Sequence, residues 1–455
     1  MLPHEVLNAY SSVVLGFGFK GSGGAGGAGG VGQADAPTAD SSASPPGVSS
    51  ASPSVIPSVI PVAPAPADLE RMAARAGAAF VRSGRKYLAL LGLGSGALAG
   101  ALAESLPAGT LCVCEQDLDL VRGLREHGQL DWWRQGAAVG LAADASPWAL
   151  FLLLDRAGVG QGDTLVLPNP ELAPQAKAAH KPLELLLTRS RPLVLPASDT
   201  SDGSDASDAP DALDAPDASG APAPRLSVAA ILAPSEPDLP EFFAQMPDWI
   251  AELVLVWDAA SLPGIHVPDR FPVRQLARPL GADFSAQRGA MLAACTGDWV
   301  LYLDADERLS PWAWATLPAL CVASAAHKVA AWHFPRLSPY PDAEHALTGF
   351  GLWPDVQLRL FRNAPSLRFV NPVHERLTGL SGAQALALDV EIEHLSRLRK
   401  GDAVLRSKLA GFDRAGAGRV RHALSAEYPS VPRALLAARS RGGPPRCLLL
   451  PPEFS

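Results

Sequence analysis

Short apolar runs separated by polar turns recur along two long stretches of the chain. In the first stretch the residues are mainly apolar over 87–91, 110–114 and 164–168. In the second stretch they are mainly apolar over 226–232, 252–257, 271–276 and 299–303, and a segment with helical spacing covers 283–295. Brief apolar runs bounded by Gly, Pro or acidic residues are typical of buried strands. The alternation predicts two α/β units, each with a mostly parallel sheet.

Two tracts without apolar periodicity separate these stretches. Residues 21–67 are rich in Gly, Ala, Ser and Pro, and Asp recurs at every third position from Asp199 to Asp217. The aspartates could bind a metal, but a block of like charges is more typical of a solvated spacer. Such tracts cannot bury enough apolar surface to fold. We therefore expect a disordered region 1–67, a Rossmann-like domain 68–197, a disordered linker 198–224, a second α/β domain 225–440 and a loose tail 441–455.

Composition narrows the class of protein. The 455 residues are 48% hydrophobic and 18% charged, which indicates globular domains. The seven aspartates of the second tract account for most of the net charge of −8, so the remainder is nearly neutral and offers no basic field for nucleic acid. Five cysteines without a C-x-x-C pair favour a reduced, cytoplasmic chain. The N-terminus is a poor signal peptide, and the apolar stretch 87–103 is short for a membrane span.

A glycine-rich turn follows the first predicted strand. Gly92, Gly94 and Gly96 come directly after it, and Glu115 ends the next predicted strand. Glycines in this place allow a tight turn and close approach of a phosphate, and an acid about 20 positions later can hold ribose hydroxyls. These four residues are therefore candidates for binding a nucleotide-like cofactor, with a purely structural βαβ unit as the alternative.

This first unit resembles the Rossmann-like fold of S-adenosylmethionine-dependent methyltransferases. Asn169-Pro170 is similar to the start of the family's N-P-P-aromatic signature, although the second Pro and the aromatic residue are absent. Leu90 stands where the family usually has an acid. The resemblance implies S-adenosylmethionine, or another nucleotide, as a ligand.

Acidic residues gather at the end of the strand predicted over 299–303. Asp304, Asp306 and Glu307 follow it directly, and Asp258 ends another predicted strand. The carboxyl ends of parallel strands are where ligands bind in such sheets. Like charges this close raise each other's pKa, so a positive group must compensate them. One hypothesis is Mg²⁺ or Mn²⁺ carrying a diphosphate. The alternative is helix capping, because Ser310 precedes a predicted helix.

The second unit resembles glycosyltransferase family 2. The segment D-F-S-A-Q-R-G-A-M-L-A-A-C-T-G-D-W-V-L-Y-L-D-A-D-E-R-L is similar to the family's central segment. The segment L-R-L-F-R-N-A-P-S-L-R-F-V-N-P-V-H-E-R-L at 358–377, and E-I-E-H-L at 391–395, resemble a bacterial subgroup related to lipopolysaccharide-core glucosyltransferases. The match covers roughly 226–410. It implies a GT-A fold, a nucleotide-diphosphate sugar as donor, and envelope polysaccharide synthesis.

The resemblance also assigns roles to individual residues. It places Asp258, Asp304, Arg288 and Glu236 at the donor, Asp306, Asp304 and His394 at the metal, and Glu375 with His374 at the acceptor. Glu375 would then take the proton of an acceptor hydroxyl in a single displacement that inverts the sugar carbon. The metal would neutralise charge on the departing diphosphate. His394 could instead contact a phosphate, or it could be an ordinary surface or core histidine. Arg288 could pair with Asp304 or with a phosphate, and Arg359 and Arg362 either hold phosphate or face solvent.

Three departures from the family pattern lie on the donor side. They fall at 233–235, 259–263 and 287–289, where the family has K-N-E, D-T-G-S-x-D and A-R-N. Two other hypotheses therefore stay open: a non-catalytic nucleotide- or sugar-binding scaffold, and a methyltransferase-like enzyme with an accessory sugar-binding domain.

The expected partners are a nucleotide sugar and a cell-surface glycan or lipid-linked acceptor. A lipid-linked acceptor implies peripheral contact with the inner face of the membrane. The segment 405–421 is basic and weakly amphipathic, which suits either a membrane surface or an ordinary solvated helix face. The sequence makes no prediction of oligomeric state.

Overall fold

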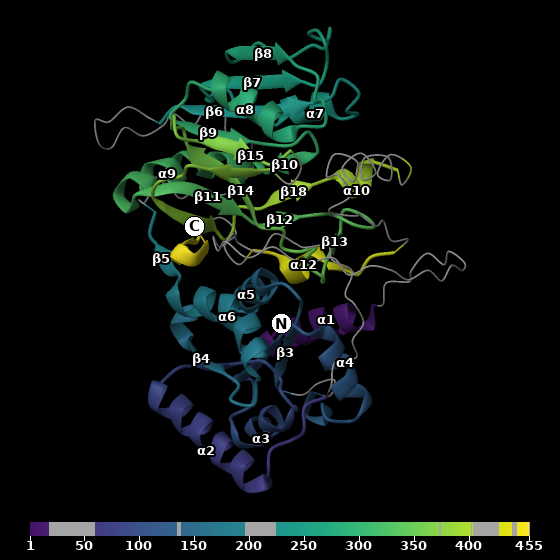
Figure 1. Ribbon diagram of the computed structural model, residues 1–455, viewed down its shortest axis with the longest axis vertical. Coiled ribbons are helices and arrows are strands. Elements are labelled where there is room, and N and C mark those ends of the chain that lie inside the picture. Colours follow the sequence, from purple (N-terminus) through teal and green to yellow (C-terminus); the bar gives the residue numbers. More distant parts are fainter. Residues whose placement is uncertain are drawn as a thin grey trace, which may run out of the picture.

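The structure, a computed structural model, describes residues 1–17, 60–133, 138–195, 224–372, 375–401, 403, 427–438 and 444–454. These residues form two α/β units, the first in the lower half of Figure 1 and the second in the upper half. The α/β class predicted from the alternation of apolar runs is confirmed. In this part of the chain no helix is both long enough and apolar enough to cross a membrane.

The first unit is a parallel sheet with the strand order β3-β2-β1-β4 and helices on its faces. The first and last of its predicted strands have the predicted bounds, because each is an apolar run closed by a turn. The elements are β1 (Tyr87–Leu91), β2 (Leu111–Glu115), β3 (Gly140–Ala143), β4 (Thr164–Pro168), α2 (Pro66–Ser83), α3 (Ala97–Ser105), α4 (Leu118–Glu126), α5 (Pro147–Arg156), α6 (Pro174–Arg189), η1 (Asp131–Trp133) and η2 (Gln161–Asp163).

An N-terminal helix, α1 (Pro3–Gly16), covers the edge of this sheet at β3. Asn8 accepts a hydrogen bond from the backbone N–H of Leu141 at 2.8 Å, and the Ser11 hydroxyl donates to the carbonyl of Leu141 at 2.7 Å. Side chains thus satisfy backbone groups that an open edge strand would leave unpaired. The prediction of disorder for residues 1–67 is wrong for this segment, and residues 18–59 lie outside the described chain.

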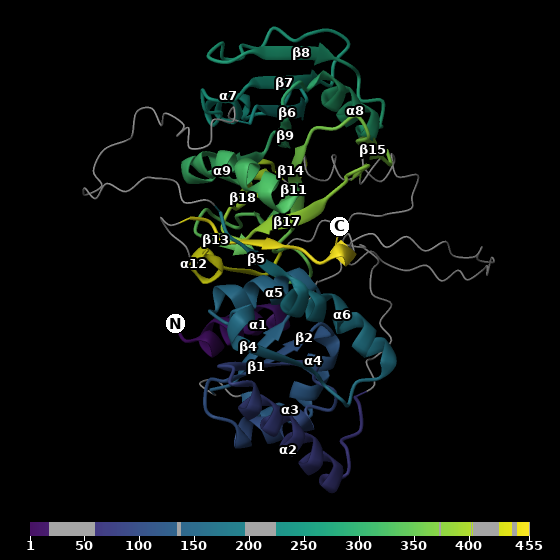
Figure 2. The ribbon, with the colours of Figure 1, turned by 90° about the vertical axis from the view of Figure 1, so that its left-hand side faces the viewer.

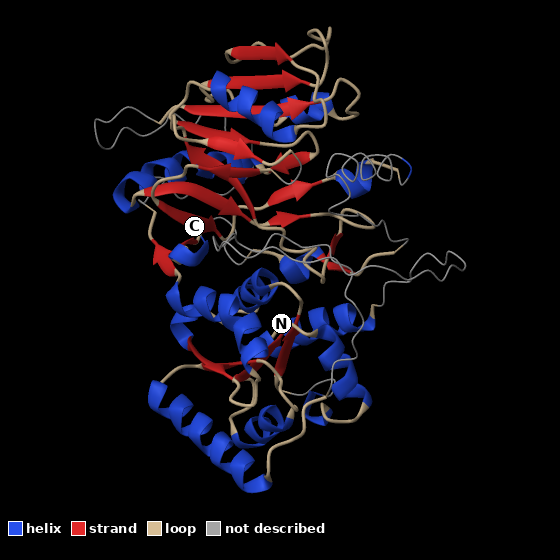
Figure 3. Cartoon of the chain, in the orientation of Figure 1, coloured by secondary structure: helices blue, strands red, loops and turns tan. Residues whose placement is uncertain are grey.

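The second unit is built on a mixed sheet with the strand order β5-β20-β17-β11-β14-β9-β6-β7-β8 (Figure 3). Its strands are β6 (Leu226–Leu232), β7 (Glu252–Trp257), β8 (Val273–Ala277), β9 (Trp299–Tyr302), β11 (Val329–Phe334), β14 (Gln357–Arg362), β17 (Ala383–Ala387), β20 (Cys447–Leu449) and β5 (Arg191–Leu193). Smaller sheets contain β10 (Glu307–Leu309), β12 (Arg336–Leu337), β13 (His345–Leu347), β15 (Arg368–Val370), β16 (Arg376–Thr378), β18 (Ile392–His394) and β19 (Ser430–Pro432). The helices are α7 (Leu239–Ala244), α8 (Phe284–Ala294), α9 (Pro311–His327), α10 (Ser396–Arg399), α12 (Arg433–Leu436) and η3 (Pro452–Phe454).

The two units share a sheet, because the last strand of the first unit lies in the sheet of the second. β5 belongs to the end of the first unit in sequence, yet it pairs with β20 in the sheet of the second unit. β20 in turn pairs with β17, so the expectation of a loose tail at 441–455 is wrong for 444–454. Apolar residues of both units, such as Leu150 and Leu436, belong to one core cluster. The predicted boundary at 197 therefore divides the sequence into two parts, but in the structure the two parts share a sheet and a core.

Polar contacts across the same junction are buried. The Tyr10 hydroxyl donates to Asp144 at 2.6 Å and accepts from the backbone N–H of Gly349 at 3.1 Å, which links α1 and the first sheet to the second unit. Burial raises the pKa of Asp144 to about 7. Arg156 of α5 donates to the carbonyl of Leu436 at 3.0 Å, in the region where α5 meets the second unit in Figure 2. These contacts hold the units in one fixed arrangement.

Candidate active site

One edge of the large sheet collects the charged residues. β6, β7 and β9 are parallel, so their carboxyl ends meet there, and β14 begins at the same edge because it runs antiparallel to β9. The edge brings together Asp304 after β9, Arg359 in β14 and Arg336 after β11. These residues are far apart in the sequence, and the sheet topology alone makes them neighbours.

Asp304 is held between two arginines. Its Oδ1 accepts from Arg288 Nη2 at 2.9 Å, and its Oδ2 accepts from Arg359 Nη2 at 2.9 Å. Burial would raise the pKa of Asp304, but the charges of Arg359 and Arg288 outweigh burial and hold that pKa well below its usual value. The aromatic ring of Tyr302 lies beneath both guanidinium groups, 4.7 Å from Arg288 and 4.5 Å from Arg359, and supports them by cation–π contact.

Glu307 is fully buried and is also compensated by arginines. Arg336 Nη1 lies 2.9 Å and Arg359 Nη2 lies 2.6 Å from its Oε1. Its other oxygen accepts the backbone N–H of Asp304 at 3.1 Å, which fixes the turn. The positive charge that the sequence required for Asp304 and Glu307 is therefore supplied by the chain itself. The position of Arg359 in its strand could have indicated that it is buried. Arg359 lies on the same buried face of β14 as Phe361, whereas Arg362 is exposed.

Glu375 meets the same cluster through Arg288. The Nε of Arg288 donates to Glu375 Oε1, while Nη2 of the same guanidinium holds Asp304. The predicted base and the predicted donor-side acid therefore share one arginine, although Arg288 and Glu375 lie 87 positions apart. His374, the other predicted acceptor-side residue, lies outside the described residues.

Asp306 has different neighbours from Asp304. The ammonium of Lys400 lies 3.0 Å from Asp306 Oδ2 and 2.9 Å from Glu236 Oε2. His394 Nε2 lies 3.6 Å from Asp306 Oδ1, and its Nδ1 lies 3.2 Å from the hydroxyl of Ser338. Burial and the charge of Arg336 lower the pKa of His394 to about 4, so this imidazole is neutral at pH 7. Sequence reasoning missed Lys400, and no local pattern marks it.

The expected metal ligands do not surround a common point. Asp304 faces Arg288 and Arg359, whereas Asp306 faces Lys400. Within the described ranges, no group of three or more His, Cys, Asp or Glu side chains could hold a metal ion. A divalent ion about 4 Å from the ammonium would be repelled by about 8 kcal/mol at an effective dielectric of about 20. The residues present do not fit the metal that the sequence led us to expect.

Asp258 lies at the carboxyl end of β7, as expected, but outside this cluster of ion pairs. Its side chain is exposed, and its Oδ1 accepts the backbone N–H of Leu280 at 2.7 Å. The carboxylate thus fixes the segment after β8. A role at a nucleoside stays a prediction.

The glycine turn of the first unit is a tight turn, as predicted, but the side chain of Glu171 occupies it. Gly92, Gly94 and Gly96 all have positive φ, at 88°, 57° and 83°. The carboxylate of Glu171 enters the turn and accepts from the Ser95 backbone N–H at 2.9 Å and from the Ser95 hydroxyl at 2.6 Å. A Cβ atom at Gly94 would lie 2.8 Å from Glu171, and one at Gly92 would collide with Leu172. An internal anion takes the place of a ligand phosphate.

Glu115 is likewise bound within the fold. Its Oε2 accepts the backbone N–H of Leu93 at 2.7 Å, and its Oε1 accepts that of Asp117 at 2.8 Å. Burial would raise the pKa of Glu115, but the hydrogen bond and charge of His180, 3.4 Å away, hold it below its usual value. The described residues give no support for S-adenosylmethionine at this turn.

Replacing Glu171 by Ala is expected to destabilise the chain by about 2–3 kcal/mol. The variant leaves the two Ser95 donors and the Leu98 N–H without their acceptor, at about 1 kcal/mol for each hydrogen bond. The matched control Glu184→Ala removes only an exposed pair with Lys181 and should change stability by less than about 0.5 kcal/mol. Urea denaturation measures both variants, and equal effects would contradict the role given to Glu171.

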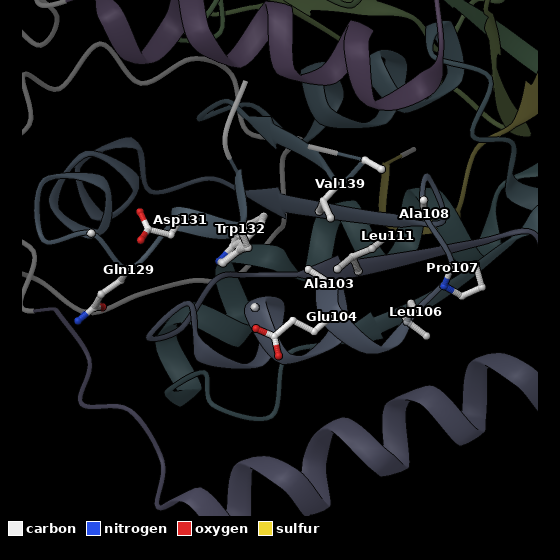
Figure 4. A pocket seen from close by; sticks show the side chains of 13 residues that line it. Ala103, Glu104, Leu106, Pro107, Ala108, Leu111, Gln129, Asp131, Trp132 and Val139 are labelled. Carbon is white, nitrogen blue, oxygen red and sulfur yellow. The ribbon is translucent and has the colours of Figure 1, made fainter. Parts of the chain in front are cut away.

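A hollow of about 540 Å³ lies elsewhere in the first unit (Figure 4). It runs along α3 beside Trp132 and reaches Leu111 and Val139, at the amino ends of β2 and β3. Cofactors bind at the carboxyl ends of parallel strands, and this hollow opens at the opposite edge. It therefore adds nothing to the candidate site.

Comparisons with known proteins give partial likenesses. No protein-family model matches the chain. A TPR repeat-containing protein of Synechococcus elongatus is 35% identical over 152 residues, which are 33% of this chain and 35% of that protein. The chain thus spans about a third of the length of this curated relative.

Two solved structures bind nucleotide sugars. S. aureus TarS 1-349 in complex with UDP-GlcNAc is 15% identical, covers 40% of this chain and 60% of that chain, and has a TM-score of 0.30. Mannosyltransferase PcManGT from Pyrobaculum calidifontis, in complex with GDP-Man and Mn²⁺, is 20% identical. The match covers 24% of this chain and 34% of that chain, and its TM-score is 0.21. Likenesses this partial do not assign a function to this chain.

Proposed function

We propose that this chain transfers a sugar from a nucleotide-diphosphate donor to a hydroxyl group of a glycan, with inversion at the sugar carbon. One observation carries the proposal: Arg288 bonds Asp304 and Glu375 at the same time. The acid expected at the donor sugar and the carboxylate expected at the acceptor therefore lie on either side of a single guanidinium. A single displacement needs a base on the acceptor side of the reacting carbon, opposite the departing diphosphate.

Each of these groups then has a distinct task. Asp304, held by Arg288 and Arg359, is fixed in orientation and stays ionised, so it can accept hydrogen bonds from the donor. Glu375 takes the proton of the acceptor hydroxyl as its oxygen attacks the sugar carbon, and the nucleoside diphosphate leaves from the opposite side. Asp258, exposed at the carboxyl end of β7, is the residue that we propose to contact the nucleoside.

The acceptor class rests on the resemblance alone. A cell-surface glycan or lipid-linked acceptor belongs to that expectation, as does peripheral contact with the membrane. The segment 405–421, proposed from the sequence as either a membrane contact or a solvated helix face, lies outside the described residues. The proposed reaction has no step that uses a metal, because the residues around Asp306 do not fit one.

A nucleotide panel tests the donor half of the proposal. UDP, GDP and dTDP are added to the full-length chain, each with Mn²⁺ and with EDTA, and the melting temperature is recorded. One nucleotide should stabilise the fold, by about 2.7 kcal/mol at a hundredfold excess over its Kd.

The control separates binding from general stability. Asp258→Asn should weaken that shift, because it removes charge at the donor edge while its amide oxygen can still accept the N–H of Leu280. Asp248→Asn, at an exposed residue that pairs with Arg270, should leave the shift unchanged. If none of the nucleotides shifts the melting of folded protein under either condition, the proposal is wrong.

A further inference from the structure

The ammonium of Lys400 occupies a built position between two carboxylates. It contacts Asp306 at 3.0 Å and Glu236 at 2.9 Å, and only 6% of its side chain is exposed. Two carboxylates within 3.0 Å favour the charged form of this ammonium. The lysine thus lies beside the acid that the family resemblance assigns to a metal.

The backbone holds Lys400 in this position. The N–H of Leu395 donates to the carbonyl of Asp306 at 2.8 Å, so α10 begins directly on the acidic turn. Arg399 pairs with Asp238 at 3.2 Å and fixes the far end of the same short helix. Lys400 thus directly follows a helix that is held at both of its ends, unlike a surface lysine that happens to reach an acid.

From this geometry we propose that Lys400 is the resident cation of the donor site and replaces a divalent metal at the diphosphate. The inference rests on the proposed function and deepens it. An ammonium donates three hydrogen bonds, and two of them go to Asp306 and Glu236. Within the described part of the chain the third has no partner, and it suits a phosphate oxygen. Asp306 and Glu236 then position the lysine and do not bind a metal.

The neighbouring histidine is consistent with this arrangement. The Nε2 atom of His394 lies 3.6 Å from Asp306 Oδ1, farther from the acid than the ammonium of Lys400 at 3.0 Å. Asp304 and Glu307 pair with Arg288, Arg359 and Arg336, whereas Asp306 pairs with Lys400. The charge on a departing diphosphate would then be stabilised by a fixed lysine, which needs no loading from solution.

Binding titrations on the full chain test the proposal. Calorimetry measures the Kd of UDP, GDP, dTDP and inorganic pyrophosphate, in EDTA and in Mn²⁺. For the wild type, the Kd of the ligand that binds should agree within about twofold between the two conditions. Lys400→Met should weaken binding in EDTA by about tenfold to a hundredfold, the usual range for one charge-assisted hydrogen bond. Mn²⁺ should restore part of this loss, because Asp306 and Glu236 are then free to bind it.

Arg397→Met is the matched control. It removes a cation from the same helix that bonds the hydroxyl of Tyr428 instead of Asp306, and it should leave the Kd in EDTA within about twofold of the wild type. Binding by the wild type only in Mn²⁺, or unchanged binding by Lys400→Met in EDTA, would overturn the role of Lys400. The absence of binding by all four ligands in both conditions would instead overturn the proposed function. The comparison of the wild-type Kd in EDTA and in Mn²⁺ needs no variant. It therefore tests the role of Lys400 even if Lys400→Met fails to fold.

Discussion

Glu375→Gln is expected to lower the turnover number of sugar transfer by about 10²–10⁴-fold, the range for loss of a general base. The amide oxygen of Gln can still accept the hydrogen bond of Arg288, so the arrangement around Asp304 should persist. The Kd of the donor nucleotide should stay within about twofold of the wild type. Steady-state transfer kinetics and nucleotide titrations on the same sample measure the two quantities.

A matched variant makes the Glu375 result specific. Glu241→Gln changes an exposed carboxylate in the first turn of α7 and should retain full activity. Glu375→Asp keeps the base but shortens the side chain, and it should recover part of the lost rate. Transfer by Glu375→Gln at the wild-type rate would show that another group takes the proton.

Arg359→Met is expected to destabilise the chain by about 3–5 kcal/mol, because it removes one partner from a buried ion network. The arginine bonds both Asp304 and Glu307, and Glu307 is completely buried. Without Arg359 the two carboxylates keep only Arg288 and Arg336 between them. Chemical denaturation measures the loss, and the midpoint should fall at unchanged slope.

The neighbouring arginine on the same strand is the control. Arg362 of β14 is exposed and contacts the face of Trp299 at 5.6 Å. Arg362→Met should therefore cost less than about 1 kcal/mol. If both variants lost the same stability, the effect would come from the strand and not from the buried network.

The strands that could be predicted are those whose own residues mark them. The runs 226–232 and 252–257 are continuous and apolar, and both are strands with those bounds. β17 (A-Q-A-L-A) and β5 (R-P-L) carry alanine or proline and few β-branched residues, so nothing local marks them as strands. β17 forms by pairing with β11 and β20, and β5 forms by pairing with β20. The pairing of β5 with β20 joins the end of the first unit to the sheet of the second. Tertiary contact here overrides local preference.

The site shows the same division between local and distant information. The linear pattern marked Asp304 and Asp306 at the end of a predicted strand, and the family resemblance marked Glu375 and Arg288. Neither of them marked Lys400 or Arg336. Lys400 lies 94 positions from Asp306, and Arg336 lies 29 positions from Glu307, so only the folded chain pairs them. The expectation of a metal followed from counting the acids without these partners.

β5 and β20 also determine how the chain responds to heat and to ligands. Each unit contributes a strand or core side chains that the other needs, so neither can unfold without exposing the interior of its neighbour. The two units should therefore behave as one cooperative system. Free energy gained by a ligand at the donor edge would then raise the unfolding temperature of the first unit as well, through mass action on a shared equilibrium.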